Sequence, residues 1–240
     1  MFTGQEVMFQ TGADHKAYIG WGAFDSNPII DYKTGTAFWP AENGQIYTLQ
    51  STKNKAPKVV RKFRYKTEHT KRNGIESSMA VVDHFGFFAD NDGNLVCIDL
   101  VTMEPQWHNF NFDDTDASIV VDTESDDYYL YVGNEVDKRG DSALANLRKI
   151  DAATGREIWS VDRLCYNYNS SEKIINGGIL STPLVGKKKS NDLVIGIFSR
   201  VNKQRKGLLV AVDKITGRER YTFNLDAYSW ASPVDFYDEK

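Results

Sequence analysis

A short motif repeated along the chain constrains its fold more than any other feature. An Asp closes an apolar run, a Thr follows, a Gly usually comes next, and an aromatic residue stands four positions after the Gly. The Asp carboxylate can accept hydrogen bonds from turn amides, and Gly readily adopts the left-handed conformation that such a turn needs. The motif therefore predicts a turn between the last two strands of a repeated antiparallel unit. Its copies are Asp151, Thr154, Gly155 and Trp159; then Asp213, Thr216, Gly217 and Tyr221; and Asp99, Thr102 and Trp107, with Met103 in place of the glycine.

Each unit begins with a pair of small polar residues followed by an apolar run. Asn43-Gly44 and Asp92-Gly93 supply hairpin signals inside the first two units, because these pairs suit the positive φ of a tight turn. The first unit has Gln50 in place of the Asp, and Phe63 is its candidate aromatic residue. The starts are "SNPIID" from Ser26, "SSMAVVD" from Ser77, "ASIVVD" from Ala117, "STPLVG" from Ser181 and "ASPVD" from Ala231. We therefore expect four-stranded units near residues 26–66, 75–113, 115–164 and 177–226.

Short apolar runs such as "NLVCIDL" and "GLLVAVD" place the chain in the all-β class. A four-stranded unit of this size cannot bury both of its faces alone. Radial repetition solves the problem, because each sheet then packs on the next. The repeat predicts a β-propeller of four-stranded antiparallel blades, in one domain that covers residues 1–240.

The repeat resembles the PQQ-type β-propeller repeat, whose blade ends in A-x-D-x-x-T-G-x-x-x-W. Ala211 to Tyr221 matches with Tyr for Trp, Lys149 to Trp159 matches after its first position, and Cys97 to Trp107 matches with Met for Gly. The resemblance covers about residues 26–235. It implies that the motif aromatics are structural and dock between adjacent blades. It also implies that about four blades of a larger, seven- or eight-bladed propeller are present.

The family that the repeat resembles has two functional branches. One comprises quinoprotein alcohol and sugar dehydrogenases, which hold PQQ and Ca²⁺ in a central funnel. The other comprises non-catalytic propellers, such as the scaffold lipoprotein of the outer-membrane β-barrel assembly machine. The dehydrogenases often carry a vicinal cysteine pair, whereas Cys97 and Cys165 fall in different units and are expected to be buried thiols.

We therefore predict a non-catalytic binding or scaffolding module for a protein or polysaccharide partner, with no cofactor. Part of a PQQ- and calcium-dependent dehydrogenase is the alternative. The resemblance implies a location outside the cytoplasm, in the periplasm or at the cell surface.

Both ends of the chain resemble incomplete blades. Residues 6–12 resemble an outer strand, and residues 229–240 resemble the beginning of an inner strand. We expect a segment of a larger propeller, either an open arc or a half that pairs with a second copy through its open blade edges. A closed four-bladed ring with loose ends remains an open alternative.

Trp21 and Trp230 are the candidate ligand contacts. Each precedes the start of a predicted inner strand, which in a propeller lies near the mouth of the central channel. An aromatic side chain there can stack on a sugar, a quinone or an extended peptide. Packing against the next blade is the alternative.

Charge patterning argues against several other functions. The net charge of −4 does not indicate a nucleic-acid partner, and no apolar run reaches the roughly 20 residues of a membrane span. The basic clusters 186–190 and 202–207 are interpreted as exposed loops rather than anion-binding patches. The acidic segments 113–118 and 122–127 are interpreted as solvated loops, with a weak divalent-cation site as the alternative. Residues 90–94 are interpreted as a hairpin turn rather than a calcium loop.

Overall fold

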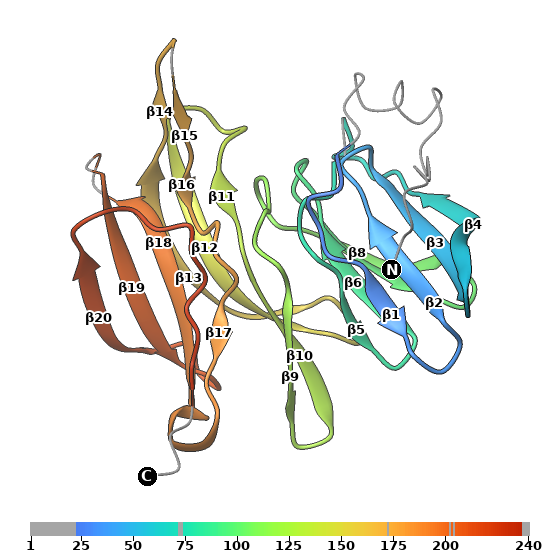
Figure 1. Cartoon of the computed structure of the whole chain (residues 1–240). Coiled ribbons are helices and arrows are strands. Elements are labelled where there is room, and N and C mark those ends of the chain that lie inside the picture. Colours follow the sequence, from blue (N-terminus) through green and yellow to red (C-terminus); the bar gives the residue numbers. More distant parts are fainter. Residues whose placement is uncertain (1–22, 72–73, 172, 202, 204, 237–240) are drawn as a thin grey trace.

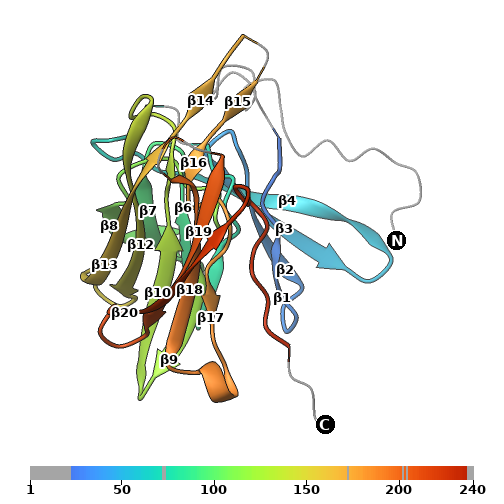
Figure 2. The same ribbon diagram turned by 90° about the vertical axis from the view of Figure 1, so that its left-hand side faces the viewer.

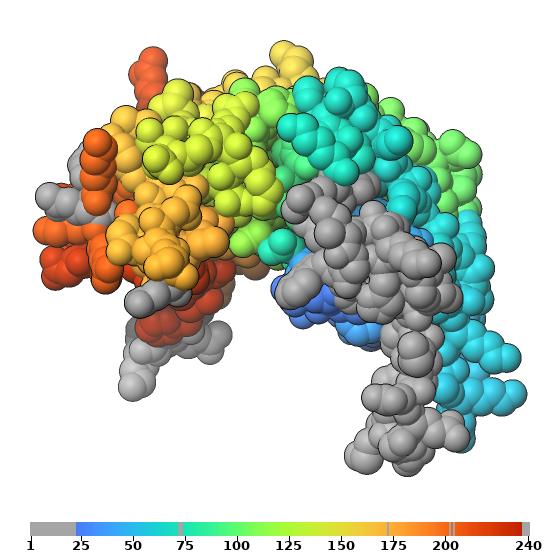
Figure 3. All heavy atoms as spheres, turned by 90° about the horizontal axis from the view of Figure 1, so that it is seen from above, coloured from blue at the N-terminus to red at the C-terminus, as the bar shows by residue number. Residues whose placement is uncertain are grey.

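Four antiparallel blades follow one another along the chain and form an arc, and the third and fourth blades belong to one ten-stranded sheet. The computed structural model describes residues 23–71, 74–171, 173–201, 203 and 205–236. Figure 1 shows the sheets side by side, and Figure 3, which looks down on them, shows the arc open between the first sheet and the fourth. The first strands of successive sheets are neighbours, since β9 contacts both β5 and β17, so these strands form the inner side of the arc. The predicted all-β class of four-stranded antiparallel blades is confirmed.

The four blades have the following strands. The first has β1 (Ile29–Asp31), β2 (Thr36–Pro40), β3 (Gln45–Thr52) and β4 (Lys55–Arg64). The second has β5 (Ala80–Val82), β6 (Phe85–Ala89), β7 (Asn94–Asp99) and β8 (Glu104–Phe110). The third has β9 (Val120–Glu124), β10 (Asp127–Gly133), β12 (Ser142–Asp151) and β13 (Glu157–Tyr166). The fourth has β17 (Leu184–Val185), β18 (Leu193–Val201), β19 (Lys206–Asp213) and β20 (Glu219–Leu225).

Short additional elements join the third and fourth blades. Strand β11 (Glu135–Val136) pairs with β16 (Gly177–Gly178), which also pairs with β18. A hairpin of β14 (Tyr168–Asn169) and β15 (Ile174–Ile175) projects beyond the sheets in both Figure 1 and Figure 2. One 3₁₀ turn, η1 (Lys188–Ser190), precedes β18. Among the described residues, no helix has the length and apolarity to span a membrane.

The Asp and Thr of the repeated motif build the turn between the last two strands of a blade. The Asp carboxylate accepts the amide of the Thr three residues later, and in two copies it also accepts the Thr hydroxyl. The bonds are Thr154 N and Oγ1 to Asp151 at 2.9 Å each, Thr216 N and Oγ1 to Asp213 at 2.8 Å each, and Thr102 N to Asp99 at 3.0 Å.

The indole of Trp107 fastens the second blade to the third. Its Nε1 donates to the carbonyl of Ala152 at 3.0 Å, in the motif turn of the next blade. The ring lies over Gly155, where a Cβ atom would stand 2.6 Å from Trp107 Cε3. Gly155 also has φ +72°, a conformation that suits glycine. The glycine is therefore needed twice, for the turn and for the room that it leaves to the indole.

Trp159 fastens the third blade to the fourth in the same way. Its Nε1 donates to the carbonyl of Lys214 at 3.1 Å. A Cβ on Gly217 would stand 2.7 Å from the indole. The aromatic residue of one blade and the glycine of the next thus form one joint.

The joint between the first and second blades uses different residues. The strand register places Arg61 opposite Thr48, which is the position that Trp107 has opposite Cys97. The Arg61 guanidinium donates to the carbonyl of Val101 at 2.9 Å, again in the next motif turn. Because no indole lies on this turn, it tolerates Met103 at φ +60° in place of glycine. The expectation that Phe63 takes the aromatic position is wrong, since Phe63 lies two residues further along β4.

A ladder of hydroxyl groups joins the beginnings of successive blades. The backbone amide of one blade donates to the hydroxyl at the same repeat position of the next. The bonds are Asn27 N to Ser78 Oγ at 3.0 Å, Ser78 N to Ser118 Oγ at 3.2 Å, Ser118 N to Thr182 Oγ1 at 3.3 Å, and Thr182 N to Ser232 Oγ at 2.9 Å. This ladder explains why the second residue of the polar pair carries a hydroxyl from the second copy onward. Residues 229–236 form no strand, although Ser232 joins the ladder.

Apolar clusters fill the spaces between blades. Phe88 packs in the cluster between the first and second blades, whereas Phe87 packs between the second and third. Adjacent residues of a strand point to opposite faces, so the middle strand β6 is apolar on both. Cys97 and Cys165 are buried free thiols in β7 and β13, and burial raises the pKa of each thiol to about 12.

Replacing Gly155 by Ala tests the joint. We expect Gly155→Ala to lower the free energy of unfolding through backbone strain at positive φ and through the clash with Trp107. Gly140→Ala is the matched control, since Gly140 has φ +90° and a Cβ added there would meet nothing within 4 Å. The cost at Gly155 should exceed that at Gly140 by about 1–3 kcal/mol in urea titrations. Equal costs would show that the indole does not press on this turn.

Candidate functional site

One position of the repeat carries a carboxylate in three successive blades. Asp25, Glu76 and Asp116 each precede the small polar pair, and Leu180 and Trp230 occupy this position in the next two copies. The ladder bonds two residues later hold these segments side by side. The position before the small polar pair is therefore acidic in the first three copies of the repeat and apolar in the next two.

Further carboxylates from neighbouring loops complete an acidic cluster. Glu42 lies in the turn between β2 and β3, and Glu135 lies in β11. Asp114 lies between β8 and β9, and Asp137 directly follows β11. Their oxygens form three overlapping groups, each with one oxygen per residue within 4.8 Å of the others. The groups are Asp25, Glu42 and Glu76; Glu76, Asp114 and Asp116; and Asp114, Glu135 and Asp137.

Burial raises the pKa of several of these carboxyls. It is the largest cause that raises the pKa of Glu42 to about 8, and a hydrogen bond with Asp25 adds to it. Burial and the charge of Glu76 raise the pKa of Asp116 to about 9. Burial raises the pKa of Asp114 to about 7. The pKa of Glu135 lies well above its ordinary value for the same first reason.

Lys138 partly neutralises one end of the cluster. Its Nζ lies 2.9 Å from Asp114 Oδ2 and also pairs with Asp137. Asp113 positions this segment, because its carboxylate accepts the amides of Asp137 at 3.1 Å and Lys138 at 2.9 Å.

In the part of the chain that the structure describes, two buried carboxylate oxygens of the cluster have no hydrogen-bond partner. They are Glu135 Oε2 and Asp116 Oδ1, and the Glu135 side chain is almost completely buried. An unpaired buried acceptor is costly. Hard divalent cations such as Ca²⁺ are bound by such oxygen groups, so the donor set suits a divalent cation.

The interpretation of residues 113–118 as a solvated loop is wrong. Asp113 and Asp114 are 2% and 3% exposed, since neighbouring blades cover them. The segment 122–127 is also more than a solvated loop. Glu124 pairs with Lys149 at 2.6 Å, and Asp122 pairs with Lys214 of the fourth blade at 2.6 Å.

Residues 90–94 form the expected hairpin turn. Asp90 accepts hydrogen bonds from the Tyr65 hydroxyl and from the Asn94 amide, and Gly93 has φ +82°. These bonds occupy the carboxylate oxygens, so the turn accounts for this acidic run.

The two tryptophans predicted as ligand contacts have different outcomes. Trp21 lies outside the described residues. Trp230 is 45% exposed, and its ring packs against Tyr228 with centroids 5.5 Å apart. A ligand contact at Trp230 stays a prediction.

None of the described residues covers the outer flank of the fourth blade, which is called the open flank below. Tyr221 stands at the position of Trp107 and Trp159 in the strand register. It is 50% exposed, whereas Trp159 is 8% exposed under the next blade. Phe223 on the same strand is 63% exposed. Strand β20 is also the outermost strand of its sheet, at the far left of Figure 1.

Solved structures share this arrangement. A europium-containing methanol dehydrogenase aligns with a TM-score of 0.58 at 12% identity over 88% of this chain and 44% of its own. A quinohemoprotein alcohol dehydrogenase from Comamonas testosteroni aligns with a TM-score of 0.58 at 10% identity, covering 86% of this chain and 35% of its own. BamB from Moraxella catarrhalis aligns with a TM-score of 0.51 at 16% identity, covering 88% and 52%.

The chain has the β-propeller fold of these structures. The predicted resemblance is confirmed at the level of fold, and the chain spans about a third to a half of the length of these structures. In sequence comparisons, no family model and no curated protein matches it.

The acidic cluster predicts an unusual pH dependence of propeller stability. With raised pKa values, the folded protein binds more protons than the unfolded chain between about pH 4 and pH 9. In buffer with a chelator, the free energy of unfolding should therefore fall as the pH rises through this range. Urea titrations at several pH values measure it.

Asp116→Asn should flatten this dependence, because it removes the carboxyl whose pKa is raised to about 9. Asp126→Asn, at an exposed carboxyl of another turn, is the control and should leave the slope unchanged. Stability that rises with pH in the wild type, or an unchanged slope in Asp116→Asn, would contradict the burial of these groups.

Proposed function

We propose that this chain is a non-catalytic binding propeller segment that holds a protein partner on the open flank of its fourth blade. The supporting observation is that, among the described residues, Tyr221 and Phe223 are exposed at positions that the next blade covers elsewhere in the arc. Exposed apolar patches of this kind mark interaction surfaces. The likeness to BamB supports the propeller fold for this role. We place the protein outside the cytoplasm, as the resemblance implies.

The chemistry of the flank defines what its partner must present. At the two Trp joints, the covering surface offers a glycine turn and a free backbone carbonyl, as at Gly155 and Ala152. Tyr221 has a hydroxyl that can donate to such a carbonyl. The free edge of β20 can also pair with an extended strand of the partner. A polysaccharide offers no such turn, so a protein suits this flank better.

A calcium- and PQQ-dependent dehydrogenase is the second candidate, and the acidic cluster favours it. The buried, unpaired oxygens of Glu135 and Asp116 fit the calcium ion. The quinone fits less well, because PQQ carries three carboxylates that would meet the carboxylates of this cluster. Lys138, the cation described there, is already paired with Asp114. Cys97 and Cys165 lie on different blades and cannot form a vicinal pair.

Site-specific photo-crosslinking tests the binding proposal. A benzoylphenylalanine at Phe223 should give a discrete adduct with a second protein in the producing cells. The same group at Tyr32, which is 93% exposed in the first blade, should give none. Tyr221→Asp should abolish the Phe223 adduct by charging the flank. Equal adducts from both positions, or none from Phe223, would contradict the proposal.

An activity measurement tests the second candidate. The chain is incubated with PQQ and Ca²⁺, alcohols or aldoses are added, and reduction of an artificial electron acceptor is followed. We expect no cofactor-dependent reduction. Turnover that Glu135→Gln abolishes would favour the dehydrogenase.

A further inference from the structure

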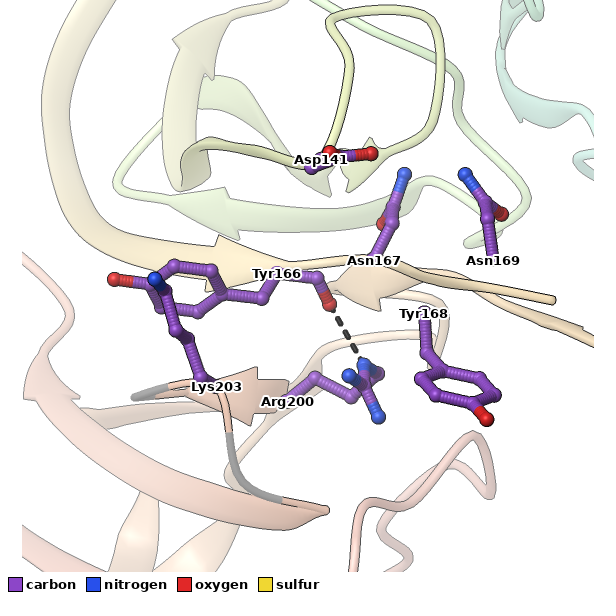
Figure 4. Close-up of a pocket in the computed structure, with 7 residues that line it drawn as sticks. All are labelled: Asp141, Tyr166, Asn167, Tyr168, Asn169, Arg200 and Lys203. Atoms are coloured by element: carbon purple, nitrogen blue, oxygen red, sulfur yellow. Dashed lines mark hydrogen bonds between the residues drawn. The ribbon is translucent and has the colours of Figure 1, made fainter.

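A pocket between the third and fourth blades lies apart from both the acidic cluster and the open flank. It has a volume of about 360 Å³ and is lined by residues of β13, β14 and the end of β18 (Figure 4). Pockets of this size hold small molecules. Arg200 lies beside Tyr166 and Tyr168 on one side of the segment that carries them, and Asp141 lies on the other side of this segment.

A backbone irregularity aims Arg200 at this pocket. The pairing of β18 with β19 shifts register between Ser199 and Val201, so Arg200 is the extra residue of a β-bulge. Its φ of +58° is a left-handed conformation, which is unfavourable for a non-glycine residue. Bulges re-aim side chains and are frequent beside functional sites.

The guanidinium of Arg200 is buried, and only some of its N–H groups donate hydrogen bonds. The residue is 3% exposed, and its Nε donates to the carbonyl of Tyr166 at 2.8 Å. Its Nη1 is buried and has no hydrogen-bond partner among the described residues. A guanidinium has five N–H donors, and an unpaired buried donor is costly. An acceptor beside Nη1 would therefore stabilise the folded protein.

Arg205 adds a second positive charge beside Arg200. Arg200 and Arg205 stack on Tyr168, 5.6 and 5.5 Å from the ring centroid. Burial first, and then the charge of Arg205, lower the pKa of Arg200. An anion in the pocket would relieve both effects.

We propose that this pocket binds the carboxylate of an acidic sugar, a hexuronate unit, with Arg200 as the anchoring donor. The planar fork of arginine matches a carboxylate. The negative charge of Asp141, which also lines the pocket, disfavours a doubly charged phosphate, and its carboxylate can accept hydrogen bonds from sugar hydroxyls. The phenol of Tyr168 and the amide of Asn169 add neutral polar groups that suit a polyhydroxylated ring.

This site is independent of the protein-binding flank, so either proposal can fail without the other. The expectation that residues 202–207 form only an exposed loop is incomplete, because Lys203 lines the pocket and Arg205 stacks on its wall.

Calorimetric titration with tetragalacturonate tests the inference, with the neutral maltotetraose and inorganic phosphate as comparison ligands. Tetragalacturonate should bind at least about tenfold more tightly than either. Arg200→Lys should weaken its binding about tenfold or more, because lysine lacks the fork. Lys189→Gln, at an exposed lysine of η1, should leave the affinity unchanged.

A second variant covers the case in which Arg200→Lys fails to fold. Tyr168→Leu alters a half-exposed wall residue and should weaken tetragalacturonate binding with little change in the urea midpoint. The proposal is overturned by no binding at about 10 mM tetragalacturonate, by tighter binding of phosphate or maltotetraose, or by full affinity in the Arg200 or Tyr168 variants.

Discussion

The contact of an aromatic ring with a glycine turn of the next blade holds this arc together. A single blade leaves both faces of strands such as β6 apolar, so no blade is stable unless its neighbours cover it. The indoles of Trp107 and Trp159 fix the orientation of each blade on the next, because each indole donates a hydrogen bond to a carbonyl of the motif turn in the next blade. At the same repeat position, Tyr221 contacts no such turn among the described residues, and it is half exposed.

The fold was predictable from the sequence because the turn chemistry is local. Asp151, Thr154 and Gly155 lie within one turn, and their spacing shows the hydrogen bonds that they form. The joint made by Arg61 and Met103 was not predictable in this way. Its two halves belong to different blades, and only the strand register shows that Arg61 replaces an indole. Met103 replaces the motif glycine and Arg61 replaces the motif aromatic residue at the two sides of the same contact between blades, so the two departures from the motif belong together.

The candidate sites were less visible for the same physical reason. Asp25, Glu76 and Asp116 stand about 40–50 residues apart, and each alone resembles a loop carboxylate. Only the alignment of the repeats on their small polar pairs could have shown them as one series. Glu135 and Asp114 join them through packing, which sequence patterns do not report. Arg200 was hidden because a bulge, and not a motif, turns it into the pocket.

A double-mutant cycle on Trp159 and Gly217 tests the joint most directly. Trp159→Leu, Gly217→Ala and the double variant are unfolded in urea, with Trp159→Leu plus Gly140→Ala as the distant pair. A smaller side chain at position 159 should leave room for the added Cβ, so the two changes should couple by about 1 kcal/mol or more. The distant pair should be additive within about 0.5 kcal/mol. Additivity at Trp159 and Gly217 would contradict the account that ring-on-glycine packing links the blades.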